Sequence, residues 1–202
     1  MAIDVCKVVS VPGQLKAELA RKGVHMLIAL VPSLAAINRS HSALLLIVGT
    51  LCYTCAEGLR FLGFSPPLIS FFTETVLRKR EQGRFVMAPI TLGLGALLAL
   101  LLFPLPVASA AIYALAFGDS ISCLVGKFLG RLRPGFLAGK SVEGSLACFA
   151  ASTLPAFAVF RDWKTALAVG LASVFVDAFP LGDYDNLLLP LAAGLAALIF
   201  QI

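Results

Sequence analysis

VASAAIYALAFGDSISCLVGKFL, residues 107–129, decides how this chain is built. The run is long enough to cross a bilayer as a helix, which takes about 20 apolar residues. Gly118-Asp119-Ser120 interrupts it near the middle. A charged side chain within the hydrocarbon layer is costly, so an aspartate at this position is a candidate functional residue. The stretch therefore predicts a membrane helix with a polar site inside it.

The rest of the chain has the same character. Of its 202 residues, 59% are hydrophobic and 13% are charged, and the mean hydropathy is +0.95. Typical soluble domains carry about 25% charged residues. Long apolar runs recur throughout, and Gly and Ala are frequent, as in membrane helices that pack closely. The alternation typical of outer-membrane barrels is absent. We expect an all-α, polytopic transmembrane helical bundle that forms one integral-membrane domain over residues 1–202.

Seven apolar segments are expected to cross the membrane, with six or eight as alternatives. They are approximately Gly23–Ile37, Ser42–Gly63, Phe85–Phe103, Val107–Leu129, Gly144–Phe160, Thr165–Phe179 and Asn186–Gln201. The first is short, so it is tilted, extended by preceding residues or partly re-entrant. Residues 68–82 have the pattern of an amphipathic helix with a basic end. Charged residues precede the first apolar core, so we expect no secretory signal peptide.

The basic residues predict the orientation of the bundle. With the N-terminus in the cytoplasm, thirteen of the sixteen Lys and Arg residues fall on the cytoplasmic side. The three on the other side are Arg39, Arg161 and Lys164. Because cytoplasmic loops of membrane proteins are enriched in Lys and Arg, the N-terminus is predicted to be cytoplasmic. The basic residues lie between the segments and form no single stripe, so we do not expect a nucleic-acid partner.

Ionisable residues within or beside the apolar segments form the candidate site. They are His25, Glu57, Arg60, Asp119, Lys127, Glu143, Asp177, Asp183 and Asp185. The predicted topology, which rests on Lys and Arg alone, places nearly all of them at the cytoplasmic ends of their segments. This placement predicts a single site that opens to the cytoplasm.

Simpler roles are open for several of these residues. Glu57 and Arg60 are three residues apart, and such neighbours on a helix can pair with each other. His25 could lie at the membrane interface, and Gly126-x-x-x-Gly130 could mark close helix packing. Asp119 has no obvious local partner, which favours a functional role. Asp183-x-Asp185-Asn186 offers hard oxygen ligands of the type that Mg²⁺ or Ca²⁺ takes, although turns also favour Asp and Asn.

The polar loop before the fifth segment contains GKSVEGS, residues 139–145. It is not a P-loop, because Pro134 occupies the position of the first required glycine. Glycines still let backbone N–H groups approach a phosphate, and Lys140 adds positive charge. Glu143 begins the next segment, where a helix N-terminus favours bound phosphate. Together with Lys127, Arg131 and the carboxylates of Asp119 and Asp185, the loop indicates Mg²⁺–nucleotide chemistry on a lipid.

Five stretches resemble the polyprenol kinase family, which includes dolichol kinase, phytol kinase and a CTP-dependent diacylglycerol kinase. They are ARKGVH (20–25), EGLRF (57–61), GDSISCLVGKFLGR (118–131), GKSVEGS (139–145) and DAFPLGDYDNLLLPL (177–191). The resemblance implies transfer of the γ-phosphate of CTP to a membrane lipid alcohol of the polyprenol, phytol or diacylglycerol class. The family often has Glu where this chain has Asp177. The long C-terminal signature of phosphatidate cytidylyltransferases is missing, which favours a kinase.

The resemblance also implies roles for individual residues. Asp119, Lys140 and Glu143 are the expected catalytic residues, and Asp119, Asp185 and Asn186 would hold Mg²⁺ or Ca²⁺. The expected contacts to the nucleotide phosphates are Lys127, Arg131, Gly139, Lys140, Ser141 and Gly144. The expected supporting polar residues are His25, Glu57, Arg60, Asp177 and Asp183. Two alternatives are a cytidylyltransferase-like enzyme that makes a CDP-lipid and a non-enzymatic membrane protein or transporter.

Overall fold

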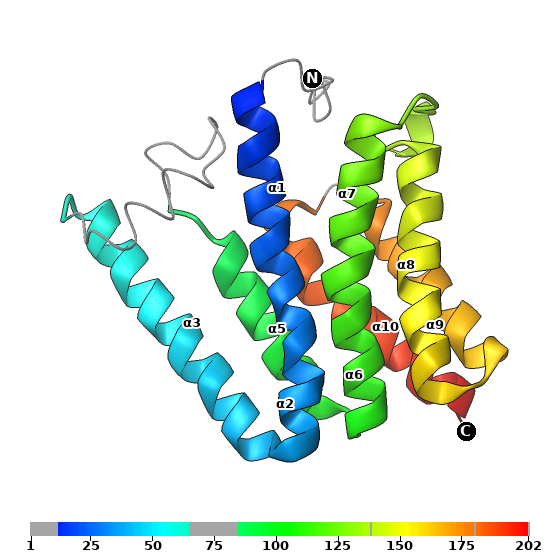
Figure 1. Ribbon diagram of the computed structural model, residues 1–202, viewed down its shortest axis with the longest axis horizontal. Coiled ribbons are helices and arrows are strands. Elements are labelled where there is room, and N and C mark those ends of the chain that lie inside the picture. Colours follow the sequence, from blue (N-terminus) through cyan, green and yellow to red (C-terminus); the bar gives the residue numbers. More distant parts are fainter. Residues whose placement is uncertain (1–11, 65–84, 138, 180, 202) are drawn as a thin grey trace.

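The computed structural model describes residues 12–64, 85–137, 139–179 and 181–201 (Figure 1). Every regular element in these ranges is a helix and none is a strand, which confirms the all-α prediction. The main helices are α1 (Pro12–Met26), α2 (Val31–Ile37), α3 (Arg39–Phe61), α5 (Ala88–Leu102), α6 (Leu105–Tyr113), α7 (Asp119–Phe128), α8 (Val142–Phe160), α9 (Trp163–Asp177) and α10 (Asp185–Gln201). Shorter helical turns are η1 (Leu27–Leu30), η3 (Ala114–Gly118), η4 (Gly135–Leu137) and η5 (Gly182–Tyr184).

Five helical stretches among the described residues are long and apolar enough to cross a membrane. They are Glu18–Ile37, Arg39–Phe61, Leu105–Phe128, Val142–Phe160 and Gly182–Gln201. Two 15-residue helices, α5 and α9, lie where the third and sixth segments were predicted. The chain is therefore a helical membrane protein by the length and composition of its helices. The predicted amphipathic helix at residues 68–82 lies outside the described residues.

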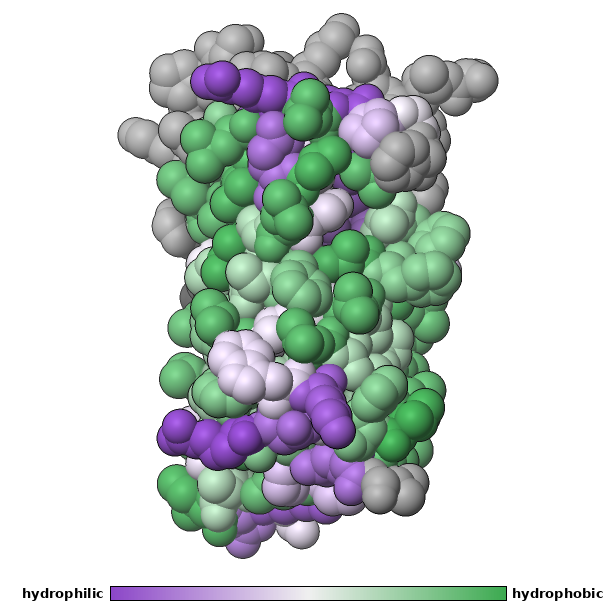
Figure 2. Space-filling model, turned by 90° about the vertical axis from the view of Figure 1, so that its right-hand side faces the viewer, coloured by the Kyte–Doolittle hydropathy of each residue, from purple (hydrophilic) through white to green (hydrophobic). Residues whose placement is uncertain are grey.

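Successive long segments run in opposite directions through the bundle (Figure 1). We call the end that holds the start of α1 and the junction between α7 and α8 the upper end. The ends of α3 and α9 and the start of α10 also lie there, whereas the C-terminus lies at the lower end. Figure 2 shows hydrophobic residues covering most of the middle of one face, with hydrophilic residues near both ends. This distribution is the one expected of a protein that sits across a bilayer.

The interior of the bundle is built from small residues with a few large ones. Leu100, Ile112, Leu115 and Leu189 are fully buried, and they pack among many buried alanines. Large side chains such as Leu45 project outward and are exposed. In a membrane the driving force between helices is close packing, because lipid is as apolar as leucine. The small residues therefore let the helices approach one another, while the large ones face lipid.

Polar side chains fix where the helices begin. Asn38 accepts a hydrogen bond from the backbone N–H of His41 at the start of α3, with a distance of 3.0 Å. Ser141 accepts one from Gly144 N at the start of α8, and Asp162 accepts one from Thr165 N at the start of α9. Each such cap satisfies a backbone donor that the first helical turn leaves without a partner.

The structure decides two details that the sequence left open. The first membrane helix starts before Gly23, because its apolar span runs from Glu18 to Ile37; it is extended by preceding residues rather than re-entrant. Gly118-Asp119-Ser120 does not break the fourth segment, which stays helical from Leu105 to Phe128. A π-helical turn, η3, replaces the break. It accommodates the polar residues by widening the helix locally, as π-turns do inside α-helices.

Candidate active site

The site begins with a polar stripe on α1. Arg21 and Lys22 are adjacent, and each lies three or four residues from Glu18 and from His25, which places the four on one face of the helix. Glu18, Lys22 and His25 are buried, whereas Leu19 and Val24 on the opposite face are exposed. This stripe is where α1 meets α7 and η3.

Lys22 and Asp119 form an ion pair at the centre of the site. The Nζ atom of Lys22 lies 2.5 Å from Oδ2 of Asp119 and 3.4 Å from the backbone oxygen of the same residue. Only 4% of the Lys22 side chain and 12% of the Asp119 side chain are exposed. A buried charge without a partner is strongly destabilising. Lys22 and Asp119 therefore each supply the opposite charge that makes burial of the other possible.

His25 lies next to this pair and is oriented by Asn186 on α10. Its Nε2 atom is 2.9 Å from Oδ1 of Asn186 and 3.4 Å from Oδ2 of Asp119. The amide nitrogen of Asn186 donates to the backbone oxygen of Ala88 and to Oγ1 of Thr91, which turns its oxygen toward the histidine. Because both neighbours of Nε2 are acceptors, that nitrogen carries the proton.

A second ion pair joins the loop before α8 to the end of α9. The Nζ atom of Lys140 lies 2.7 Å from Oδ1 of Asp177, and Ser122 donates to the same oxygen at 3.4 Å. Asp177 is 3% exposed. Burial alone would lower the pKa of the Lys140 ammonium, but the carboxylates of Asp177, Asp185 and Asp119 raise that pKa above its ordinary value. Lys140 is therefore charged at neutral pH.

Glu18 connects α1 to α7 at the edge of the site. Its Oε1 atom forms ion pairs with Arg21 and with Lys127, the latter at 2.7 Å, and accepts a hydrogen bond from Cys123 at 3.5 Å. The Nε atom of Arg21 is buried and has no hydrogen-bond partner among the described residues. An unpaired buried donor costs roughly 1–3 kcal/mol. Arg21 therefore retains a donor that a bound anion could use.

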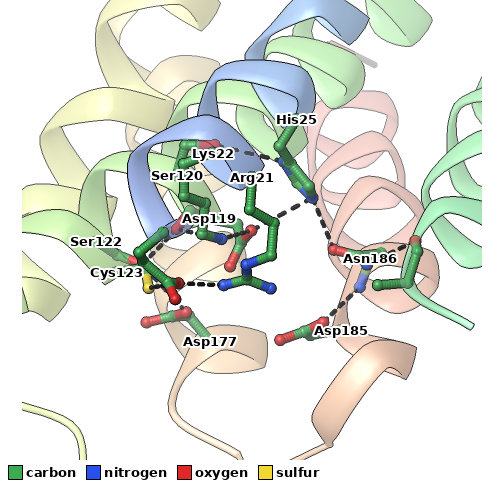
Figure 3. A network of polar contacts seen from close by, with 12 residues as sticks. Arg21, Lys22, His25, Asp119, Ser120, Ser122, Cys123, Asp177, Asp185 and Asn186 are labelled. Carbon is green, nitrogen blue, oxygen red and sulfur yellow. Dashed lines mark hydrogen bonds and ion pairs between the residues drawn. The ribbon is translucent and has the colours of Figure 1, made fainter. Parts of the chain in front are cut away.

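These side chains form one polar cluster, which we define by its ionisable groups and the asparagine. Its members are Glu18, Arg21, Lys22, His25, Asp119, Lys127, Lys140, Asp177, Asp185 and Asn186. Figure 3 shows most of them converging from four helices, α1, α7, α9 and α10. The four Lys and Arg members equal the four Asp and Glu members in number, so these charges balance within the cluster. Such a site can exchange its internal ion pairs for a bound anion and an accompanying cation.

Seven of the residues predicted from the sequence meet in this cluster. They are His25, Asp119, Lys127, Lys140, Asp177, Asp185 and Asn186. Glu57 and Arg60 are engaged with each other instead. Arg60 donates to both carboxylate oxygens of Glu57 at 2.7 Å, and the backbone N–H of Val86 donates to the same carboxylate. These contacts match the simpler role considered for the two residues, a pair on one helix. Through Val86 the pair also connects the end of α3 to the chain before α5.

Two further predicted residues, Arg131 and Glu143, take part in the loop between α7 and α8. Glu143 accepts hydrogen bonds from the backbone N–H groups of Arg131 and Leu132, and the Arg131 side chain is exposed. Arg133 donates to the backbone oxygens of Gly126 and Gly139, which holds the loop against α7. The contacts of Glu143 are thus with the loop backbone. Asp183 lies on η5, half-buried, in the turn that leads to α10.

The predicted phosphate-binding residues of the loop have different surroundings. Gly139 has a φ of +90°, which favours glycine, and its Cβ position faces open space. Ser141 is buried and its hydroxyl caps α8. A Cβ on Gly144 would lie 3.2 Å from the Cα of Gly126, so these two glycines are where α8 and α7 approach each other closely. Of the two glycines predicted to contact phosphate, Gly139 is therefore the one that remains open to a ligand.

The carboxylates of the cluster offer only a partial set of ligands for a cation. Within the described ranges, no three His, Cys, Asp or Glu side chains lie close enough to hold a metal ion by themselves. Lys22 and His25 both contact Oδ2 of Asp119, which leaves Oδ1 as the oxygen able to face a cation. Mg²⁺ commonly uses one or two carboxylates and takes its other ligands from phosphates and water. Asp119 and Asp185 would supply such a partial set.

Sequence reasoning did not single out Glu18, Arg21 and Lys22 as members of the site. The orientation argument treated the two basic residues only as charges before the first segment. The helical spacing of Glu18, Arg21, Lys22 and His25 was the signal that could have placed all four on one face. Comparison with models of protein families, with curated proteins and with solved structures finds no match for this chain.

Proposed function

We propose that this protein is an integral-membrane kinase that transfers the γ-phosphate of CTP to the hydroxyl of a lipid alcohol. The observation that carries the proposal is the polar cluster, where buried basic and acidic groups meet at one end of an otherwise apolar bundle. A soluble, highly charged substrate and a membrane-bound one can meet only at such an end. The resemblance of the five sequence stretches to polyprenol kinases supports the same reaction.

The proposed topology has seven passes, with the N-terminus and the polar cluster on the cytoplasmic side. The alternating direction of the helices supports seven passes if α5 and α9 also span the bilayer. Apart from Arg39, Arg161 and Lys164, the basic residues in the described ranges lie in the upper parts of α1, α3 and α7 or in the loop between α7 and α8. A cytoplasmic upper end satisfies the positive-inside rule and gives access to CTP.

The basic members of the cluster would bind the triphosphate. Arg21, Lys22, Lys127 and Lys140 reach the cluster from α1, from α7 and from the loop before α8, so they can surround a phosphate chain. Phosphoryl transfer asks little covalent chemistry of a protein, and catalysis is mostly positioning and charge stabilisation. Arg21 has a further donor available at Nε.

Asp119 and Asp185 would hold Mg²⁺ together with the phosphates, and Asn186 would keep this part of the site in place. When bound, the ion would neutralise charge that develops on the transferred phosphoryl group. Lys22 fixes the carboxylate of Asp119 in position through its ion pair. Asp119 can then orient the acceptor hydroxyl. Asn186 positions His25 against Asp119 through its hydrogen bond to Nε2.

Packing of the lower half favours an enzyme over a transporter. Ala99, Leu100, Val107 and Ile112 are almost fully buried in a tightly packed apolar core. A transporter would need polar groups along a path through the bilayer. A cytidylyltransferase-like enzyme remains the alternative, and it differs in releasing pyrophosphate instead of CDP.

The test is a transfer assay with purified protein in lipid nanodiscs, Mg²⁺ and CTP labelled either at the γ-phosphate or in the cytidine. A panel of polyprenol, phytol and diacylglycerol is supplied, and the lipid products are separated. The kinase predicts a lipid that carries γ-label and no cytidine, with loss of the product in Asp119→Asn. A lipid that carries the cytidine label identifies the cytidylyltransferase instead. If no labelled lipid forms with any acceptor, whether the donor is CTP or ATP, both the kinase and the cytidylyltransferase are refuted.

A further inference from the structure

An apolar groove lies between α9 and α10 on the outside of the bundle. Its volume is about 440 Å³, and all of its lining residues are apolar. They are Phe175, Val176, Phe179, Leu181, Leu188, Leu191, Ala192 and Leu195. The polar cluster described above uses none of these side chains.

The upper part of the groove adjoins the polar cluster. On α9, Asp177 follows Val176 directly, so one residue lines the groove and the next turns its carboxylate toward Lys140. On α10, Leu188 comes one turn after Asp185. The groove and the cluster therefore share the same turns of both helices.

The groove lies within the membrane part of the protein. It follows α10 from Leu188 to Leu195, about 10 Å along the helix axis. These residues belong to the apolar span Gly182–Gln201. Phe175 and Leu195 at its rim are exposed on the outer surface of the bundle. An occupant must therefore come from the hydrocarbon of the bilayer.

We propose that this groove holds the hydrocarbon chain of the lipid alcohol, with the hydroxyl at the end next to Asp177 and Asp185. The inference rests on the proposed kinase function and adds the route by which the acceptor reaches it. A neutral hydroxyl can lie beside these carboxylates while Lys140 stays paired with Asp177, whereas a lipid phosphate placed here would compete with the nucleotide phosphates for Lys140. The cluster thus suits an alcohol as acceptor, and the groove aligns it.

The groove should position the acceptor chain more than it strengthens binding. The chain moves from one apolar environment to another, so burial of hydrocarbon contributes little net affinity. What the groove supplies is a fixed direction of approach, and a fixed approach contributes to rate by removing orientational freedom. Filling the groove should therefore harm long-chain acceptors and spare acceptors too short to reach it.

A matched pair of variants tests this. Ala192→Phe fills the proposed groove, and Ala36→Phe places the same side chain in a second surface groove lined by Pro32, Leu105 and Tyr113. With geranylgeraniol as acceptor, we expect kcat/KM to fall at least tenfold in Ala192→Phe and to match the wild type in Ala36→Phe. With prenol, which has too short a chain to fill the groove, all three proteins should be equal. Wild-type kinetics of Ala192→Phe with geranylgeraniol would overturn the proposal.

A second readout separates this inference from the proposed reaction. A geranylgeraniol analogue with a diazirine on its chain is photolysed with wild-type protein, and the labelled peptide is identified. We expect label within residues 175–195, which unlabelled geranylgeraniol should displace. Label elsewhere in the chain refutes binding of the acceptor in the groove, even if turnover is normal. This result does not depend on whether Ala192→Phe folds. Specific label within 175–195 without phosphorylated product upholds the groove and refutes the kinase.

Discussion

Lys22 and Asp119 are 97 positions apart in the chain, yet the ammonium of one lies 2.5 Å from the carboxylate of the other. The pair joins α1 to α7 inside the bundle. It also places a lysine that precedes the first apolar core of the sequence at the centre of the candidate site. Most of the chemistry proposed for this protein depends on the state of these two residues.

Asp119→Asn should lower turnover more than about tenfold, which corresponds to ~1.4 kcal/mol of transition-state stabilisation. An amide is a poor ligand for Mg²⁺ and leaves phosphate charge uncompensated. Turnover in nanodiscs measures this effect, with Asp183→Asn on the nearby turn as the control. An Asp119→Asn protein that keeps more than a tenth of wild-type turnover would refute the role assigned to Asp119.

Lys22→Met should destabilise the protein as well as inactivate it. Removing one partner of a buried ion pair leaves the other charge uncompensated, at a cost of about 3–5 kcal/mol. The double variant Lys22→Met/Asp119→Asn removes both charges and should unfold at a higher temperature than Lys22→Met alone. Thermal unfolding in one detergent gives the comparison. Equal melting temperatures for the single and double variants would contradict the pairing.

Lys140→Ala should lower turnover roughly 10²–10³-fold, as expected when a charge-stabilising donor is lost from a partly buried site. Lys140→Arg keeps the charge but changes its geometry, so it should restore activity only in part. A role as a simple membrane anchor predicts full activity for Lys140→Arg and nearly full activity for Lys140→Ala. CTP binding measured on the same preparations separates these outcomes.

The pH dependence of Lys140 follows from the direction of its pKa shift. The neighbouring carboxylates raise the pKa of Lys140 in the folded protein. The stabilisation from its charge is therefore complete below the unfolded pKa of about 10.4 and is lost only as pH rises through the higher folded value. The difference in melting temperature between wild type and Lys140→Met/Asp177→Asn, which removes this charge together with its buried partner, should stay constant from about pH 6 to pH 9. A difference that shrinks toward pH 9 would contradict the shift.

Glu57→Gln should affect stability and leave the chemistry intact. Glu57 is fully buried and accepts from Arg60 and from the backbone of Val86. A glutamine would turn an N–H donor toward the guanidinium, and breaking a buried ion pair costs about 3–5 kcal/mol. We expect a lower melting temperature with normal turnover per folded molecule at a permissive temperature. Loss of turnover without loss of stability would show that Glu57 takes part in the reaction and contradict its structural role.

Cysteine accessibility tests the orientation of the bundle. In a cysteine-free background, Gly135→Cys should react with a membrane-impermeant maleimide only after cells are opened. Lys164→Cys, which is exposed at the start of α9, should react in intact cells. The reverse pattern would place the polar cluster on the outside, where CTP is not available.

Apolar runs were enough to locate the helices. The two that start after Asn38 and Ser141 lie close to their predicted positions, because apolar length and capping residues are local signals. The fourth segment is one helical stretch with a polar site inside it, as predicted, but the π-turn beside Asp119 was not foreseen, because no residue type in the sequence indicates it. The number of helices that cross the bilayer is not settled by pattern alone, as the 15 residues of α5 illustrate.

The site was predictable in its residue types more than in its pairings. Asp119 and Lys140 were found because a charge inside or beside an apolar run is costly and therefore conspicuous. Their partners, Lys22 and Asp177, depend on which helices are neighbours, and that follows from packing over the whole chain. Charge counting alone cannot distinguish a lysine that anchors a helix end from one that is buried.

The widened turn η3 has a consequence for how such a site could originate. A π-turn accommodates one residue more than an α-helical turn, and each residue advances about 100° around the helix axis. The extra residue in Ala114–Gly118 therefore sets the side of the bundle that Asp119 faces. A single-codon insertion in a regular membrane helix could thus rotate a carboxylate from one neighbour to another. Evolution can assemble a buried charge pair in this way through chain length, with every residue type left unchanged.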